Sequence, residues 1–372
     1  MLLSMDLPED RSPATSPVDE TTTPPAKTSA ESPADALTDP ATDVLGDDPD
    51  DVSGYEPDAD LPPGYVDFVT EAPIDGELPA RWIHGSPSAR RNTDPAIQVH
   101  RYDRHTVVLR QNKAVHYEAP FIYLLFGNER ALLLDTGATA EPARFPLRET
   151  VDGLISEWLA EHPRPTYPLV VAHTHGHSDH VGADAQFADR PDTTVVATDA
   201  EAVREFFGLP GYTWFDLGGR LLEVTPIPGH HEASIAIFDP WTGFLLTGDT
   251  VYRGRLYVDD IAAFTDSLET LVAIAANRPV SHVLGCHIEM RQKPRRDYPI
   301  GVRYQPDEPV VQMTPAHLTA VRNAAVAVAD RPGVHVFDDF EIFNGPCRRA
   351  VAIHRLRALW STFRNWLISL FR

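Results

Sequence analysis

The sequence is poor in cysteine, in long apolar runs and in basic charge. Its 372 residues include two cysteines, Cys286 and Cys347, so a disulfide framework is not expected and a reducing, cytoplasmic environment is favoured. No run approaches the roughly 18 apolar residues of a membrane-spanning helix. The N-terminus, MLLSMDLPEDR, lacks the basic start and the apolar length of a secretory signal. We therefore expect a cytoplasmic globular protein.

The negative charge is concentrated at the N-terminus. The chain has 32 Lys and Arg against 54 Asp and Glu, a formal net charge of -22. Residues 1–60 hold 16 acids and two bases, which leaves -8 for the other 312 residues. They also have no aromatic residue before Tyr55 and are rich in Pro, Ser and Thr, so we expect a disordered tail. The mildly acidic remainder offers no basic surface for nucleic acid.

Residues 61–345 have the sequence pattern expected of one α/β domain. Apolar runs typical of buried strands occur at 121–126, 131–135, 168–172, 194–197, 234–238 and 243–249. Helical spacing of apolar residues occurs at 150–162, 264–279 and 315–333. Strands that alternate with helices predict a layered α/β fold.

Residues 346–372 form a basic amphipathic helix by the same criterion. They contain six arginines and no acids, and their large apolar residues fill an arc of roughly 140° at about 100° per residue. Such a helix packs on its own domain or on a second subunit, as in a homodimer, or it lies on an anionic membrane surface. The sequence leaves these alternatives open.

A stretch rich in His and Asp, THGHSDH, follows the apolar run 168–172. It supplies His175, His177, Asp179 and His180 within six residues. Imidazole and carboxylate groups are ligands for zinc, iron and similar ions. Residues two apart in an extended segment point the same way, so His175 and His177 can hold one ion while Asp179 and His180 face a second.

Three further fragments carry similar side chains after apolar runs. They place His230 after a Pro-Gly turn, Asp249 in LLTGDT and His287 in VLGCHIE. Because α/β proteins build sites at the carboxyl ends of strands, these residues are candidates for the same site.

The order of these fragments resembles the metallo-β-lactamase superfamily. T-H-x-H-x-D-H is followed by P-G-H-x-x-x-S, G-D-T and a final histidine, and ALLLDTG (131–137) resembles the strand and turn before the family's metal motif. The resemblance covers about residues 95–345 and implies a four-layered αβ/βα sandwich. It implies one metal on His175, His177 and His230, a second on Asp179, His180 and His287, and Asp249 as the bridging ligand.

His180 distinguishes this chain from true β-lactamases, which lack a histidine after the motif aspartate. The pattern is more similar to the glyoxalase II and lactonase branches. It implies a dinuclear hydrolase of a small ester, thioester or lactone, in which a metal-bridging hydroxide attacks and Asp179 and Asp249 are catalytic. Two divalent ions are expected as cofactors, with zinc first and iron or manganese as alternatives.

Other activities remain open on the same motif. They are a mononuclear iron oxidoreductase similar to persulfide dioxygenase, and a phosphodiesterase or nuclease, which the acidic balance disfavours. A non-enzymatic alternative is a membrane- or partner-binding protein that works through residues 346–372.

Several residues near the motif are expected to have supporting roles. Packing is expected for His173 and His282, a turn near the site for Asp135, and an exposed or supporting position for His231. Glu232 and Glu289 are candidates for steadying a ligand imidazole, with a plain surface role as the alternative. Substrate contact is a hypothesis for three tyrosines: Tyr257, Tyr298 and Tyr304.

Overall fold

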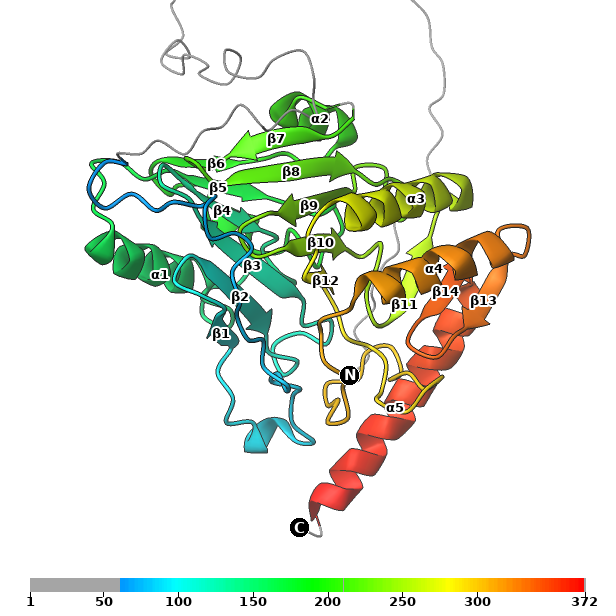
Figure 1. Cartoon of the computed structure of the whole chain (residues 1–372). Helices are drawn as coiled ribbons and strands as arrows, with labels where there is room; N and C mark the ends of the chain where they lie inside the picture. The colour runs from blue at the N-terminus through cyan, green and yellow to red at the C-terminus, as the bar shows by residue number, and fades with distance from the viewer. Residues whose placement is uncertain (1–60, 210, 371–372) are drawn as a thin grey trace, which may run out of the picture. The chain divides into compact units, whose positions relative to one another are not determined.

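The computed structural model describes residues 61–209 and 211–370; the tail expected over residues 1–60 lies outside this range. Two large sheets face each other and carry helices on their outer faces (Figure 1). The first sheet has the order β1-β2-β3-β4-β5-β6 and the second β12-β10-β9-β8-β7. The strands of the first sheet are β1 (Ile97–Arg101), β2 (Thr106–Gln111), β3 (Phe121–Phe126), β4 (Ala131–Leu134), β5 (Leu169–Ala172) and β6 (Thr193–Val195). Those of the second are β7 (Thr213–Asp216), β8 (Leu221–Pro226), β9 (Ile235–Asp239), β10 (Phe244–Gly248) and β12 (His282–Gly285).

Alternate side chains along one strand contribute to two different layers of the hydrophobic core. In β3 the side chains of Tyr123 and Leu125 join the core between the sheets, whereas Ile122 and Leu124 join the core under α1 (Leu147–Glu161). Successive side chains on a strand point to opposite faces, so a strand buried on both faces reads as a continuous apolar run.

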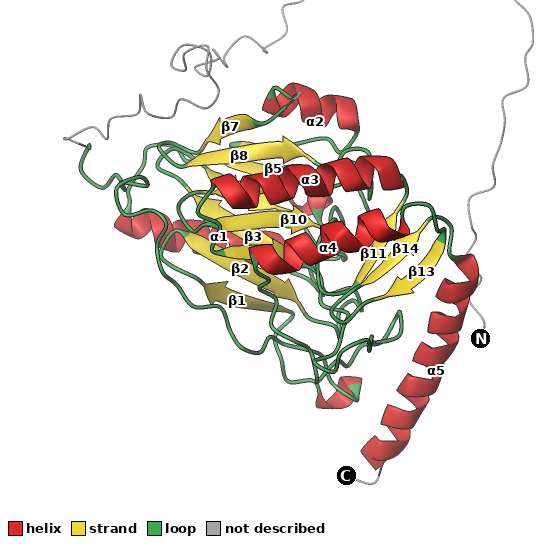
Figure 2. Ribbon diagram, turned by 45° about the vertical axis from the view of Figure 1, so that its right-hand side comes forward, coloured by secondary structure: helices red, strands yellow, loops and turns green. Residues whose placement is uncertain are grey.

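The second sheet is covered by α3 (Ile261–Asn277) and α4 (Pro315–Val328), which lie side by side across it (Figure 2). Their residues Phe264, Leu268, Leu318 and Val321 pack into one core with the outer face of that sheet. The order helix, sheet, sheet, helix confirms the predicted αβ/βα sandwich. The helix expected over 315–333 is shorter, because it ends at Val328 before the Pro-Gly pair.

A smaller sheet lies beside α4. It has the order β11-β14-β13, with β11 (Arg255–Val258), β13 (Gly333–Val336) and β14 (Glu341–Asn344). The chain then continues into α5 (Arg348–Leu370), the amphipathic helix that the sequence predicts. One short helix, α2 (Ala200–Phe207), and two 3₁₀ turns, η2 (Ala89–Arg91) and η3 (Asp184–Gln186), complete the described elements.

A buried histidine next to α1 makes the stability of the fold depend on pH. His105 accepts a hydrogen bond at Nδ1 from Trp158 Nε1 at 3.0 Å, and burial lowers its pKa to about 4. Since the unfolded pKa is about 6.5, the neutral ring stabilises the fold fully above that pH. This stabilisation is lost as the pH falls from about 6.5 towards 4.

We therefore expect acidification over that window to lower the free energy of unfolding by up to roughly 3 kcal/mol through this residue. Urea unfolding at several pH values measures the change, with His105→Gln as the variant that cannot titrate. The variant should show a shallower pH dependence; equal slopes for both proteins would exclude the effect.

Candidate metal centre

The predicted site residues come from loops that follow strands of both large sheets. His175, His177, Asp179 and His180 follow β5 of the first sheet. The second sheet contributes the remaining three from the loops after β8, β10 and β12, namely His230, Asp249 and His287. The structure brings all seven together, in two adjoining groups.

Glycine makes the close approach of two of these loops possible. Gly248 precedes Asp249 and has a φ of 53°, and a Cβ on it would lie 2.7 Å from the Cβ of Thr174. Both the backbone conformation and the space therefore require glycine at this position of the G-D-T fragment.

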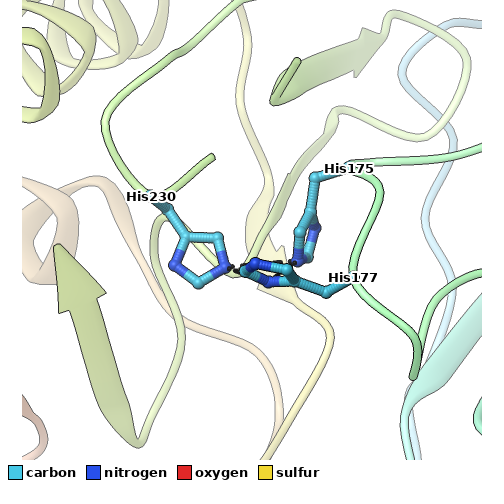
Figure 3. A group of neighbouring side chains, drawn as sticks. All are labelled: His175, His177 and His230. Atoms are coloured by element: carbon cyan, nitrogen blue, oxygen red, sulfur yellow. Dashed lines mark hydrogen bonds between the residues drawn. The ribbon is translucent and has the colours of Figure 1, made fainter. Parts of the chain in front are cut away.

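The first group consists of three imidazoles that point at one another (Figure 3). His175 Nε2 lies 2.9 Å from His177 Nδ1, and His230 Nε2 lies 3.1 Å from the same atom and 3.2 Å from His175 Nε2. His230 Nδ1 lies 2.7 Å from the carbonyl oxygen of Tyr257, which can only accept, so Nδ1 donates and Nε2 presents a lone pair. Nitrogens bound at 2.0–2.1 Å around one tetrahedral ion would be about 3.3 Å apart, close to this spacing.

The second group holds two carboxylates and two imidazoles. His287 Nε2 lies 3.4 Å from Asp179 Oδ2, from Asp249 Oδ1 and from His180 Nε2. His180 Nε2 lies 3.6 Å from Asp249 Oδ2, which is also 3.9 Å from His230 Nε2 of the first group. Asp249 therefore belongs to the second group and also adjoins the first.

The donor set is suited to divalent cations. Asp249 is buried, and its Oδ1 has no hydrogen-bond partner among the described residues. A buried carboxylate oxygen left unpaired is costly unless a cation or another partner satisfies it. Three facing imidazole nitrogens next to such a carboxylate fit zinc or a similar ion.

Mutual electrostatics favour ionised carboxylates at this site. Burial alone would raise the pKa of Asp249, but His287 and His180 outweigh it and lower that pKa to about 2. Burial likewise opposes a charge on His287, but Asp249 and Asp179 raise its pKa to about 9. In the first group, burial and the neighbouring His180 and His230 hold the pKa of His175 well below its usual range. In the first group His175 thus presents unprotonated nitrogen, whereas the second group pairs ionised carboxylates with protonated imidazoles.

Asp135 supports the second group through its contact with His180. Its Oδ2 lies 3.0 Å from His180 Nδ1, and its Oδ1 accepts from the backbone N–H of Thr174 at 2.8 Å. The thiol of Cys286 donates to the same Oδ2 at 3.2 Å. Asp135, with a φ of 70°, fixes both the turn after β4 and the direction of the His180 ring.

Other histidines near the motif lie outside both groups. His173 is buried with Nε2 2.9 Å from Asp184 Oδ1, and His282 Nδ1 lies 2.9 Å from Ser281 Oγ at the start of β12. His231 is half-buried beside the first group, with its ring centroid 5.1 Å from that of His177.

Two of the supporting roles expected from the sequence are corrected. Glu289 does not steady an imidazole: it is buried, forms an ion pair with Arg255 and accepts a hydrogen bond from Tyr252 Oη at 3.1 Å. Tyr298 is not free to contact a substrate, because it is buried and its hydroxyl oxygen accepts from the backbone N–H of Asp307 at 2.6 Å.

The other candidates have weaker links to the centre. Glu232 is exposed, and the ring of Tyr304 lies beside His84. Tyr257 reaches the centre through its backbone carbonyl, while its ring packs 4.9 Å from that of Phe343.

Two residues that lie next to His287 belong to no recognisable sequence motif. The carbonyl oxygen of Glu118 lies 3.3 Å from His287 Nδ1, and the ring of Tyr252 packs edge-on at 5.5 Å. A backbone contact from a loop can be made by any residue type, so sequence gave no indication of Glu118. Tyr252 was also missed; it lies three residues after Asp249, and that proximity is the signal that could have indicated it.

Comparison with known proteins shows which enzymes this chain is similar to. Residues 118–280 match the family model described as the metallo-beta-lactamase superfamily. A hydroxyacylglutathione hydrolase of Anaeromyxobacter dehalogenans is 34% identical over 134 residues, which cover 36% of this chain and 46% of the relative. The human acyl-coenzyme A thioesterase MBLAC2 is 26% identical over 206 residues, which cover 45% of this chain and 72% of the relative. Over residues 118–280 the chain is similar to the metallo-beta-lactamase superfamily.

The similarity to hydroxyacylglutathione hydrolases is to the glyoxalase II-like branch, as the motif with His180 predicts. The superfamily match includes every residue of the two groups except His287, which lies beyond its end. The chain spans about half the length of the hydroxyacylglutathione hydrolases that it matches. A solved DIM-1 metallo-beta-lactamase aligns over 64% of this chain and all of its own, with 14% identity and a TM-score of 0.44.

Proposed function

We propose that this protein is a metal-dependent hydrolase that cleaves thioester bonds. The observation that carries the proposal is Asp249, a buried carboxylate whose Oδ1 makes no hydrogen bond among the described residues. It lies between three imidazoles on one side and an Asp, His and His set on the other. Both kinds of relative are named as enzymes that act on acyl thioesters, hydroxyacylglutathione hydrolase and acyl-coenzyme A thioesterase.

Two divalent ions fit the donor set, and zinc suits it best. His175, His177 and His230 would hold one ion, Asp179, His180 and His287 the other, and Asp249 would be shared. Divalent ions so placed lower the pKa of a water molecule and polarise a carbonyl oxygen.

The protein's own groups have separate tasks in this proposal. Asp249 supplies the buried negative charge that balances the cations. Asp179, whose side chain is 20% exposed, is the ligand-group carboxylate most open to solvent and can orient an attacking water by accepting its hydrogen bond. Hydrolysis then joins the water oxygen to the carbonyl carbon and breaks the C–S bond, giving a carboxylate and a thiol.

Release of free thiol tests this function. The purified protein is incubated with a hydroxyacylglutathione, an acyl-coenzyme A and an oxygen ester of the same acyl group, and thiol or acid is measured. We expect turnover of at least one thioester above that of the oxygen ester. No thiol release from either thioester, by protein supplied with zinc, would refute the proposal.

Asp135 is expected to control metal affinity without binding metal itself. Asp135→Asn keeps the shape of the side chain but weakens its contacts with His180 and Thr174. Loss of such support typically lowers metal affinity about 10- to 100-fold. Competition with a metal indicator dye measures it. Asp184→Asn is the matched control, because Asp184 contacts His173 and Thr136 instead, and equal affinities for the two variants would contradict the role of Asp135.

A further inference from the structure

The helix α5 contacts the rest of the described chain through one narrow side. His354 Nδ1 lies 3.1 Å from Asp297 Oδ2, and Arg357 Nη2 donates to Asp297 Oδ1 at 3.3 Å. Ala358 packs into a small buried cluster with Tyr298 and Val302. In Figures 1 and 2 the helix extends away from the small sheet as a separate rod.

Five large apolar residues of α5 are exposed. The residues are Ile353 (57% exposed), Leu356 (67%), Leu359 (70%), Trp360 (68%) and Phe363 (48%). They make up five of the nine large apolar side chains that are exposed among the described residues. At about 100° per residue they span an arc of roughly 120°, centred opposite His354 and Ala358. Of the alternatives that the sequence left open, packing on its own domain does not apply to these five residues, which we call the outer face.

Basic residues border the outer face. On the same helical projection, Arg355 lies on one side of the arc and Arg357 on the other, and both are exposed. The sequence of residues 346–372 has six arginines and no acid, whereas the whole chain has a net charge of -22. The positive charge is thus local to the helix that carries the apolar arc.

We propose that the outer face of α5 lies on the surface of a membrane that contains anionic lipid. Trp, Leu and Phe on one side of a helix, bordered by arginine, suit the boundary between acyl chains and anionic headgroups. The helix lies on the surface and does not cross it, since no helix within residues 61–209 and 211–370 is long and apolar enough to span a membrane.

Charge favours a membrane over a second copy of this chain. Two α5 helices paired through their outer faces would bring their arginines together with no acidic residue of either helix to offset them. An anionic bilayer offers the opposite charge along the whole helix, and each nearby basic residue strengthens the attraction.

Co-sedimentation of the full chain with vesicles tests the proposal. We expect binding to vesicles of phosphatidylcholine with phosphatidylserine, weaker binding to phosphatidylcholine alone, and release at high salt. Leu356→Glu and Trp360→Glu should each lower the partition coefficient about tenfold or more, because each replaces a large exposed apolar side chain with a charge.

Val326→Glu is the matched control, since Val326 is 51% exposed on α4, away from the outer face. It should bind vesicles like the unaltered chain. A full chain that stays in the supernatant would overturn the proposal, as would equal losses in all three variants. Loss of a dimer by Leu356→Glu, seen by sedimentation equilibrium without vesicle binding by the unaltered chain, would assign the face to a second copy. Thioester hydrolysis is measured separately, so either proposal can fail alone.

Discussion

The Asp249→Ala variant is expected to lose about 1000-fold in kcat/KM for a thioester and to lose bound metal at the same time. Asp249 lies next to both groups, and its Oδ1 makes no hydrogen bond in the described structure and lies 3.4 Å from His287 Nε2. Bound divalent ions contribute several kcal/mol to catalysis, and each ~1.4 kcal/mol is a factor of ten in rate. Steady-state kinetics and elemental analysis of the same preparation measure the two losses.

Asp266→Ala is the control for this variant, because Asp266 is an exposed aspartate on α3. It should keep both activity and metal. Circular dichroism shows whether each variant is folded. If folded Asp249→Ala keeps activity within tenfold, the ligand groups are not the catalytic centre.

The Arg220→Ala variant is expected to lower the free energy of unfolding by about 3–5 kcal/mol, because it leaves a buried carboxylate without its partner. Arg220 is 1% exposed, and its Nη2 lies 2.6 Å from Asp239 Oδ2 of the second sheet. Its guanidinium also donates to the carbonyl oxygens of His105 (2.7 Å) and Phe126 (3.0 Å) on the first-sheet side. The buried side chain of Arg220 therefore forms polar contacts with both sheets.

Chemical unfolding measures this change. Arg101→Ala is the control, since Arg101 pairs with Glu157 in a bridge whose two side chains are 52% and 66% exposed. Exposed pairs of this kind contribute about 0–1 kcal/mol. Similar losses for both arginines would show that the Arg220 network adds no special stability.

The elements predicted from sequence are those whose burial is visible in composition. Strands β3 and β4 are apolar at almost every position because both faces are covered. The small sheet was missed, since β11 pairs with β14 from a distant part of the chain and each strand has only four residues. The eight-residue α2 was missed because two turns give too little periodicity.

The site was predictable where residue type and spacing carry the chemistry. His175, His177 and Asp249 stand in motifs whose order suggested one centre, and the structure groups them. Contacts made across the fold were not visible in this way. The hydrogen bond that Tyr298 Oη accepts from the backbone N–H of Asp307 is a result of tertiary packing, and the same holds for the ion pair of Glu289 with Arg255.

The orientation of α5 shows the same limit. Helical spacing predicts the apolar arc. The side of the helix that packs on the domain depends on the contacts of His354 with Asp297 and of Ala358 with Tyr298. The sequence therefore left packing and membrane binding open, and the structure leaves the five residues of the outer face exposed.

The most direct test of a metal-dependent thioesterase is hydrolysis by one sample that is stripped with a chelator and then titrated with zinc. Thiol release and zinc per chain are measured at each point. We expect no turnover in the stripped protein, recovery as zinc binds, and saturation at two ions per chain. Thioester hydrolysis by the metal-free chain, or full zinc occupancy with oxygen consumption and no thiol release, would contradict the proposed function.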